Sequence, residues 1–319
     1  MNCHYFKKTQ PIITLLTDFG LSDSYVGAMK GVMLLANPKL KFVDITHEIP
    51  QGKIKLAAFR LFTAYQYFPK QTIHLVVVDP GVGTKRNPII VETPDYYFVG
   101  PDNGVFSWIY AQEKFKVYKI DINRQTAVGR RWTISNTFHG RDIFAPTAAS
   151  LSSGIKPATL GSPLSKWSAF KLPTPVFVGN RHVPAESRRE RDKPQSSSRG
   201  TCSPMRVGTH HDVFLQGEVI DIDRFGNLIT NISKSLFHKE KNRVHKKEGK
   251  FEPSLEPLGH FEIKIGNHVI RELKTSYEGT SPIAIFGSSG FLEISLPNGN
   301  CADFLHSKPE TKITIAYRH

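Results

Sequence analysis

Short apolar runs alternate with helical patterns over residues 12–78, and this alternation constrains the fold more than any other feature of the chain. The runs Ile12–Thr17, Lys41–Ile45 and Ile73–Val78 are predicted strands, and Ser24–Ala36 and Ile54–Tyr67 between them carry apolar residues at helical spacing. This order is typical of a mostly parallel sheet sandwiched by helices. The third run, IHLVVV, is rich in β-branched residues and is predicted to be central.

The strand pattern continues through Pro88–Glu92, Tyr96–Val99 and Phe115–Ile120, followed by a predicted helix over Asp142–Ser152. After about Lys171 the pattern changes to short β-like segments, which suggest a small sandwich or barrel. These segments are Val213–Ile222, Leu228–Ile232, His260–Ile265, Ile283–Phe286, Phe291–Ser295 and Ile313–Tyr317. The predicted fold class is therefore α/β, with an additional all-β, barrel-like C-terminal domain.

Three regions follow from this change of pattern. An α/β domain is expected over residues 10–175 and a basic, polar linker or insert over 176–212, where RRERDKPQSSSRG has no apolar period. A β-barrel domain is expected over 213–319, interrupted by a polar insert at 234–254.

The formal net charge of +14 is concentrated in two polar segments. Residues 181–206 carry a net +4 and residues 234–250 a net +5, and both have few aliphatic or aromatic side chains. Solvated loops of this kind do not form a folded basic face, and they offer little for bases to stack on. Nucleic-acid binding is therefore not expected as the main function.

The three cysteines, Cys3, Cys202 and Cys301, are scattered and form no disulfide framework or zinc pattern, and no other residues have convincing metal-ligand spacing. We expect neither a metal nor a cofactor. No stretch is apolar for long enough to span a bilayer, and MNCHYFKKTQ lacks the features of a secretory signal. The expected compartment is the cytoplasm.

Polar residues stand where the predicted strands end. Asp18 closes the first strand, Asp44 and His47 come at the end of the second, and Asp79 closes the third. Ligands of open α/β sheets bind outside the carboxyl ends of the strands, so Asp18 and Asp79 are expected close together at a binding edge. The alternative for each aspartate taken alone is a turn residue or a helix cap.

The segment Asp79–Arg86, DPGVGTKR, places a carboxylate at a strand end before a turn that can approach a ligand. It lacks the third glycine and the following helix of a dinucleotide fingerprint, and the G-K-[ST] element of a P-loop. An ion pair between Asp79 and Arg86 across the turn is the alternative interpretation.

The segment Thr137–Asp142, TFHGRD, is a second polar cluster. Asp142 suits the first turn of the following helix, which leaves His139 on a loop, where histidines often act as general bases or hydrogen-bond donors. The segment Ile222–Asn227, IDRFGN, could bind a ribose and a purine, or it could be a tight hairpin turn.

Taken together, these segments resemble the family of S-adenosyl-methionine (SAM) hydroxide adenosyltransferases, over about residues 12–160 and again from Gly217 to the end. The motifs that carry the resemblance are TDFG at Thr17–Gly20, YVGAMKG at Tyr25–Gly31, DITHEI at Asp44–Ile49, VVVDPGVGTKR at Val76–Arg86, GPDNG at Gly100–Gly104, TFHGRD at Thr137–Asp142 and IDRFGNLITNI at Ile222–Ile232.

The resemblance implies hydrolysis of SAM to adenosine and methionine by an enzyme that is a homotrimer with sites between subunits. It implies Asp79, Arg86 and His139 as the group that activates water, with apolar walls from Phe138 and Phe225. The positions that it implies for contacts with SAM are Asp18, Phe19, Asp23, Asp79, Phe138, Asp223, Phe225, Asn227, Ser288 and Glu293.

Two other functions remain open on the sequence. The related 5′-halogenases share the fold and the SAM site, but they carry other residues where this chain has Asp79 and His139. The fluorinases among them also have a long insertion between the positions of Arg86 and Gly100, a stretch that is short here. A non-catalytic SAM or adenosine sensor is the second alternative, against which the intact Asp79, Arg86 and His139 speak.

Overall fold

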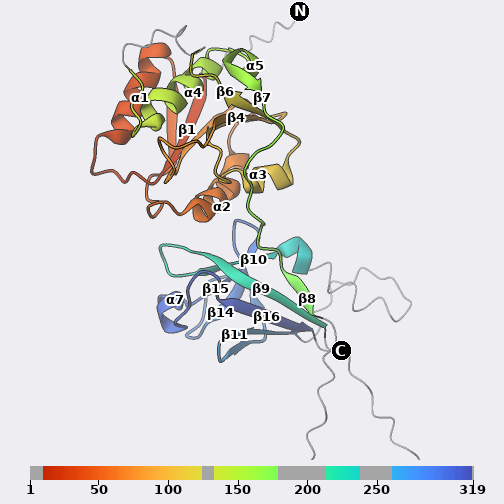
Figure 1. The fold of residues 1–319 in the computed structure, drawn as a ribbon. Coiled ribbons are helices and arrows are strands. Elements are labelled where there is room, and N and C mark those ends of the chain that lie inside the picture. Colours follow the sequence, from red (N-terminus) through yellow and green to blue (C-terminus); the bar gives the residue numbers. More distant parts are fainter. Residues whose placement is uncertain (1–9, 124–132, 179–212, 238–260, 318–319) are drawn as a thin grey trace, which may run out of the picture. The chain divides into compact units, whose positions relative to one another are not determined.

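The computed structural model describes residues 10–123, 133–178, 213–237 and 261–317 (Figure 1). The chain divides into two compact units, residues 1–172 and 173–319. Each unit is described by itself.

The first unit is built on a seven-stranded sheet with the order β2-β1-β3-β5-β4-β6-β7. The neighbours β2, β1, β3 and β5 pair in parallel, whereas β4 and β7 run against them, so five of the seven strands point the same way. The mostly parallel sheet expected from the sequence is confirmed. Its strands are β1 (Ile12–Thr17), β2 (Lys41–Thr46), β3 (Ile73–Val77), β4 (Pro88–Glu92), β5 (Tyr97–Pro101), β6 (Lys116–Ile120) and β7 (Gly161–Pro163).

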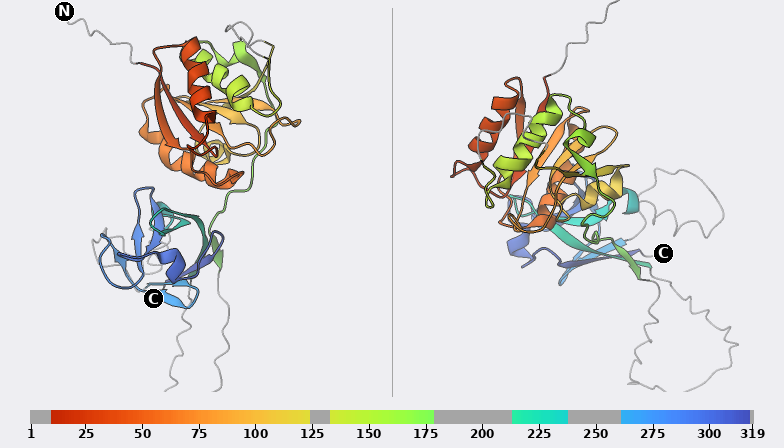
Figure 2. Two further views of the ribbon diagram at one scale, coloured as in Figure 1. Left: turned by 90° about the vertical axis from the view of Figure 1, so that its left-hand side faces the viewer. Right: turned by 45° about the horizontal axis from the view of Figure 1, so that its top comes forward.

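Helices cover both faces of this sheet (Figures 1 and 2). On one face the core contains side chains from α1 (Tyr25–Ala36) and α4 (Ala145–Ser152), and on the other it contains side chains from α2 (Ile54–Ala64). Along β3 the alternation of a strand divides the residues: Ile73, Leu75 and Val77 face the first core, and Val76 faces the second. Because both faces are covered, every residue of β3 is buried, as its continuous apolar run predicts.

Two predicted helices differ from the structure in detail. The second helix ends at Ala64 and continues as one 3₁₀ turn, Tyr65–Tyr67. The helix expected from Asp142 begins earlier, as the π-helical turn Gly140–Phe144 that leads into α4. The described part of the unit also contains two shorter helices, α3 (Ser107–Gln112) and α5 (Pro157–Leu160).

The second unit is a curled, mostly antiparallel sheet with the order β12-β11-β16-β9-β10-β15-β14-β13, and β8 also pairs with β9. In its described residues this half-barrel agrees with the all-β, barrel-like expectation, apart from a short helix, α7 (Cys301–Phe304), and a helical turn at 234–237. Its strands are β8 (Val176–Val178), β9 (Val213–Ile222), β10 (Leu228–Ser233), β11 (Phe261–Ile265), β12 (His268–Ile270), β13 (Leu273–Lys274), β14 (Ile283–Phe286), β15 (Phe291–Ser295) and β16 (Lys312–Tyr317).

The structure corrects the beginnings of both predicted inserts. The linker predicted at 176–212 starts too early, because β8 pairs with residues 214–216 of β9 and belongs to the sheet. The insert predicted at 234–254 also starts too early, since residues 234–237 form a helical turn and Phe237 is fully buried in the core. There its ring packs edge-on against Phe261, with the ring centroids 5.6 Å apart. The remainders of both inserts, 179–212 and 238–254, lie outside the described residues.

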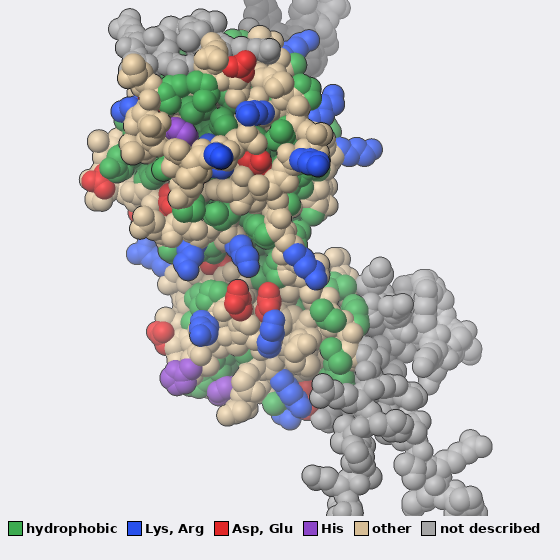
Figure 3. Space-filling model, viewed as in Figure 1, with side chains coloured by type: hydrophobic (Ala, Val, Ile, Leu, Met, Phe, Trp, Pro, Cys, Tyr) green, Lys and Arg blue, Asp and Glu red, His purple; other side chains and the backbone are tan. Residues whose placement is uncertain are grey.

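Among the residues that the structure describes, no helix is long and apolar enough to cross a membrane. On the face shown in Figure 3, acidic side chains lie between the basic ones on both units. The two segments with most of the excess positive charge lie almost entirely outside the described residues.

Candidate active site

Arg86 joins the other two side chains that the resemblance implies as catalytic, Asp79 and His139. Its Nε donates to both carboxylate oxygens of Asp79, at 3.0 and 2.9 Å, and its Nη2 donates a further short hydrogen bond to Asp79 Oδ2. The same Nη2 lies 2.7 Å from Nδ1 of His139. The guanidinium therefore holds the carboxylate and the imidazole of residues 79 and 139 in one cluster, here called the Arg86 cluster.

The Arg86 cluster is largely shielded from solvent. The side chain of Arg86 is 9% exposed and that of Asp79 is 5% exposed. The ring of Phe144 lies under the guanidinium, 5.1 Å from its carbon to the ring centroid, in cation–π geometry. The remaining nitrogen of Arg86, Nη1, is buried and has no hydrogen-bond partner among the described residues. The cluster thus offers one spare, buried donor to a ligand.

The protonation state of His139 follows from its neighbours. Burial and the adjacent Arg86 lower the pKa of His139 below its ordinary value of 6.5, and the carboxylates of Asp79 and Asp142 oppose this only partly. The imidazole is therefore neutral at pH 7. A guanidinium can only donate, so Nδ1 accepts from Arg86 and the proton of the neutral ring resides on Nε2. His139 presents an N–H group at its free nitrogen.

Two loops bring the Arg86 cluster together. Asp79 follows β3, and the turn after it approaches the loop before His139 so closely that a side chain at Gly83 would collide with the carbonyl oxygen of Asn136. Gly83 also has a φ of +76°, which a glycine adopts without strain. A larger residue here would push the two loops apart.

Asp142 holds the loop that carries His139. It is fully buried, its Oδ2 accepts from the backbone N–H of Ser135 at 2.8 Å, and Arg141 pairs with its Oδ1 at 2.7 Å. The place predicted for Asp142, in the first turn of the helix, is confirmed, although that turn is π-helical. His139 stands directly before this turn.

Asn103 binds the backbone next to Asp79, and no role was predicted for it from the sequence. Its Nδ2 donates to the carbonyl oxygen of Val78 at 2.9 Å, and its Oδ1 accepts from the N–H of Val105 at 3.2 Å. Val78 directly precedes Asp79, so Asn103 ties the end of β3 to the GPDNG motif. The only indication in the sequence was that Asn103, a hydrogen-bonding side chain, belongs to the GPDNG motif.

The predicted substrate residues of the first unit lie around the ends of β1 and β3. Asp18 follows β1, and its Oδ2 accepts from the N–H of Gly52 at 2.9 Å. Phe19 and Phe138 are in edge-on contact, with ring centroids 5.9 Å apart. Tyr25, which the sequence analysis did not assign, packs against both at 5.6 and 5.2 Å. Asp23 is exposed shortly before α1.

In the second unit, Asp223 and Asn227 belong to the turn between β9 and β10. Asp223 Oδ1 accepts from the N–H groups of Phe225 and Asn227, both at 2.9 Å, and its Oδ2 accepts from Asn227 Nδ2 at 2.8 Å. The hairpin-turn alternative is thus right as a description of the local structure. At the tip the side chain of Phe225 is 76% exposed.

Glu293 on β15 is one of the buried carboxylates of this unit. Burial raises the pKa of Glu293, and the nearby Asp223 adds to the rise. Tyr277 donates its hydroxyl to Glu293 Oε2 at 3.0 Å. No periodic pattern surrounds Tyr277 in the sequence, so its contact with Glu293 could not be predicted. Ser288, also predicted to contact the substrate, is exposed in the turn between β14 and β15.

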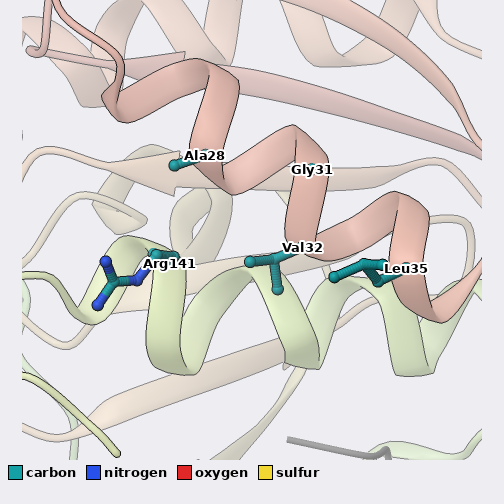
Figure 4. A pocket seen from close by; sticks show the side chains of 5 residues that line it. All are labelled: Ala28, Gly31, Val32, Leu35 and Arg141. Atoms are coloured by element: carbon teal, nitrogen blue, oxygen red, sulfur yellow. The ribbon is translucent and has the colours of Figure 1, made fainter. Parts of the chain in front are cut away.

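The described residues also form a hollow of about 420 Å³ between α1 and the π-helical turn (Figure 4). Ala28, Gly31, Val32 and Leu35 line it from the helix, and Arg141 lines it from the π-helical turn. None of the predicted site residues lines it. Within the described part of the chain, no group of three or more His, Cys, Asp or Glu residues could hold a metal ion.

Two models of protein-family domains match the chain and together span most of it. Residues 13–161 match the SAM hydroxide adenosyltransferase N-terminal domain, and residues 217–314 match the C-terminal domain of the same family. A relative from Methanocaldococcus jannaschii, named (R)-S-adenosyl-L-methionine hydrolase, is 31% identical over 96% of each chain.

The fold has a similar counterpart among solved structures. A protein from Thermotoga maritima, described as an uncharacterized conserved protein, superposes with a TM-score of 0.73 at 31% identity, over 95% of this chain and 99% of its own. Among the relatives found by sequence, a fluorinase from an Actinoplanes species is more distant, 21% identical over 72% of this chain and 74% of its own.

Proposed function

Because the chain belongs to the SAM hydroxide adenosyltransferase family, we propose that it hydrolyses SAM to adenosine and L-methionine. The observation that carries the proposal is the Arg86 cluster, in which one guanidinium contacts both Asp79 and the Nδ1 atom of His139. The reaction needs an in-line nucleophile at the ribose C5′, and water is a weak one unless a positioned group takes its proton.

Within the Arg86 cluster, Asp79 takes the proton of the water. His139 does not serve as the base in this state, because its Nδ1 accepts from Arg86 and its Nε2 carries the proton. Arg86 stays protonated throughout. The buried Nη1 of Arg86 has no other partner among the described residues, and we assign it to the water oxygen. A donor at that oxygen lowers the pKa of the bound water and eases the transfer of its proton to Asp79.

The displacement is a single SN2 step. The water oxygen bonds to C5′ as the C5′–S bond breaks, the electron pair of that bond passes to sulfur, and methionine leaves as a neutral thioether. No general acid is needed for this leaving group. The proton of the water passes to Asp79 and then to solvent, and the reaction requires no cofactor. Attack on a cation neutralises charge, which a site poor in water favours.

Residues of both units contact the substrate in this proposal. Asp18 and Asp79 serve the ribose, and Phe19 and Phe138 give apolar contacts beside them. Asp23 and the predicted residues of the second unit bind the rest of the adenosine and methionine portions. These are Asp223, Phe225, Asn227, Ser288 and Glu293.

We propose a homotrimer with its sites between subunits, as the family resemblance implies. Exposed apolar side chains support an association of subunits: Leu35 on α1 is 68% exposed and Phe225 is 76% exposed. Light scattering of the purified protein should give three times the mass of one chain. A monomeric mass with full activity would contradict the trimer. The cytoplasm remains the predicted compartment.

The product of the reaction tests the function directly. Purified protein is incubated with SAM, in parallel with an Asp79→Asn variant, and the nucleoside is identified by mass spectrometry. Adenosine and methionine are expected in equal amounts, and far less in the variant. A 5′-halo-adenosine formed when chloride or fluoride is added would identify a halogenase. Binding of SAM without turnover would identify a sensor.

A further inference from the structure

The motif Asp44–Ile49 has no part in the proposed reaction, yet it contains a buried histidine. His47 follows β2, and its side chain is only 2% exposed. Histidine is polar and titratable, so complete burial needs compensating partners. The partners of His47 lie at the ends of two neighbouring strands, β1 and β2.

On one side His47 holds the segment that follows β1. A hydrogen bond of 2.8 Å joins its Nδ1 to Thr17 Oγ1, and its backbone carbonyl accepts from the N–H of Gly20 at 2.8 Å. Thr17 Oγ1 also accepts from the N–H of Phe19 at 3.3 Å. His47 therefore has contacts at both ends of the four-residue segment Thr17–Gly20.

On the other side the ring of His47 meets an ion pair. Its Nε2 lies 3.2 Å from Asp44 Oδ1, without the alignment of a hydrogen bond, so this contact is chiefly electrostatic. Asp44 in turn accepts from Lys30 of α1 through Oδ2, at 2.7 Å. The imidazole is thus fixed between a charged group on β2 and the segment that follows β1.

The segment Thr17–Gly20 carries Asp18, the first of the predicted ribose contacts. Among the residues that the structure describes, only one carboxylate oxygen of Asp18 has a hydrogen-bond partner, the N–H of Gly52. Gly20 closes the segment with a φ of +66°, a conformation that favours a tight turn. The direction in which Asp18 presents its second oxygen therefore depends on how the ends of this segment are held.

We propose that His47 is a positioning residue for substrate binding, whose imidazole fixes Asp18 through Thr17. This inference rests on the proposed function, since it takes Asp18 as a ligand of the ribose. The described contacts of His47 are with the segment Thr17–Gly20 and with Asp44, and none is with the Arg86 cluster. The loss of His47 therefore weakens the binding of SAM and leaves the chemical step nearly unchanged.

The structure supplies a matched control in a second Thr–His pair on the same strand. His74 on β3 is fully buried, and its Nδ1 lies 2.8 Å from Thr14 Oγ1 on β1. Its ring stacks on Phe98, away from the turn that carries Asp18, with the centroids 5.0 Å apart. Replacing His74 removes the same kind of hydrogen bond and the same buried ring, but it touches no site residue.

The test compares His47→Ala, His47→Asn and Thr17→Val with His74→Asn. We expect KM for SAM to rise roughly tenfold or more in His47→Ala, because a small misplacement of a binding group is costly, with kcat within about twofold of wild type. His47→Asn should recover part of the affinity, since its amide can reach Thr17 Oγ1. Thr17→Val should also raise KM, and it leaves no cavity in the core because valine has nearly the same volume as threonine. His74→Asn should lower Tm but leave KM unchanged.

Each contrary result has a distinct meaning. An unchanged KM in folded His47→Ala and Thr17→Val would overturn the inference, and so would equal changes of KM in the His47 and His74 variants, which indicate a general structural role. If wild-type protein forms no adenosine, the proposed reaction fails, and calorimetric titration with SAM then tests His47 by affinity alone. Absence of both turnover and SAM binding in wild type would contradict both proposals.

Discussion

The predicted site residues of the two units are arranged differently. In the first unit, Asp79 and His139 come from two loops and are joined by Arg86, whose buried Nη1 has no partner among the described residues. In the second unit, Asp223 and Asn227 come from a single turn and satisfy one another, and Phe225 at its tip is 76% exposed. One group has an unused buried donor, and the other has an unused apolar surface.

This difference indicates a division of labour. A buried guanidinium with a spare donor suits a small polar reactant, and holding such donors in place before the reaction lowers the barrier. An exposed aromatic ring on a rigid turn suits a flat, partly apolar ligand instead. We therefore expect changes in the Arg86 cluster to act mainly on kcat and changes in the turn that carries Phe225 mainly on KM. The predictions below test this division, from the largest expected effect to the smallest.

Replacing Asp79 should have the largest effect. Asp79→Ala removes the group that takes the proton of the water, so kcat should fall by at least ~10²-fold. KM should rise as well, because the same carboxylate serves the ribose. Steady-state assays of adenosine formation measure both constants, with circular dichroism to verify folding. Turnover near that of wild type would remove Asp79 from the mechanism.

His139→Ala should lower kcat by at least ~10²-fold while SAM binds nearly normally, because its Nδ1 holds the guanidinium that we assign to the reacting water, and it has no proposed contact with the substrate. Isothermal titration with SAM and single-turnover assays separate the two effects. A variant that binds SAM poorly but turns it over at the wild-type rate would move His139 into the binding group.

The pH dependence of kcat should follow the neutral form of His139. Burial and Arg86 lower the pKa of this group below 6.5, so the ring stays neutral at pH 7 and gains its proton only in more acidic solution. Protonation of Nδ1 breaks the hydrogen bond from Arg86. We therefore expect kcat to be constant between pH 6.5 and 8 as far as this group is concerned, and to fall about tenfold per pH unit below the lowered pKa.

The residual turnover of His139→Ala should lack this acidic limb. A limb centred above pH 6.5 in wild type that disappears in His139→Ala would contradict the assignment of a lowered pKa.

Phe225→Ala should raise KM roughly tenfold and leave kcat within about twofold, because the exposed ring contributes apolar contact to the bound substrate and nothing to the displacement. Phe304→Ala is the matched control, since that ring is 49% exposed in the same unit and has no predicted contact with SAM. If Phe225→Ala changes kcat as strongly as His139→Ala, the division between the units is wrong.

Deleting residues 182–208 and bridging the ends with a short Gly/Ser linker should have the smallest effect. The segment has no hydrophobic period, so its removal should cost little stability and leave activity and the trimer mass intact. Loss of folding in the shortened chain would show that this segment packs in the native protein.

The sequence predicted the elements with clear periodicity well. The apolar run of β3, and the alternation of strands with helices from β1 onward, predicted the mostly parallel sheet. Burial on both faces of a strand leaves a strong local pattern in the sequence. Three-residue strands such as β8 have no such signal, since their place depends on a partner distant in the sequence. Phe237 was missed for the same reason, because two apolar residues, Leu236 and Phe237, in a short polar segment show no period that would mark them as core residues.

The candidate site was predictable to a similar degree. Motifs identified Asp79, Arg86 and His139, but the contact of Arg86 with His139 spans 53 residues of sequence, and no local pattern shows which nitrogen is engaged. The hydrogen bonds of His47 and Asn103 were not predictable either, because they join these side chains to segments that are distant in the sequence.

The central claim is that water activated by the Arg86 cluster attacks C5′, and the fate of the oxygen tests it most directly. The reaction is run with SAM in ¹⁸O-labelled water, and both products are analysed by mass spectrometry. The account predicts label in the 5′-hydroxyl of adenosine, none in methionine, and inversion at a chirally deuterated C5′. Retention would indicate a covalent intermediate with a carboxylate nucleophile such as Asp79. Unlabelled adenosine, or methylthioadenosine as the main product, would contradict the mechanism even if SAM were consumed.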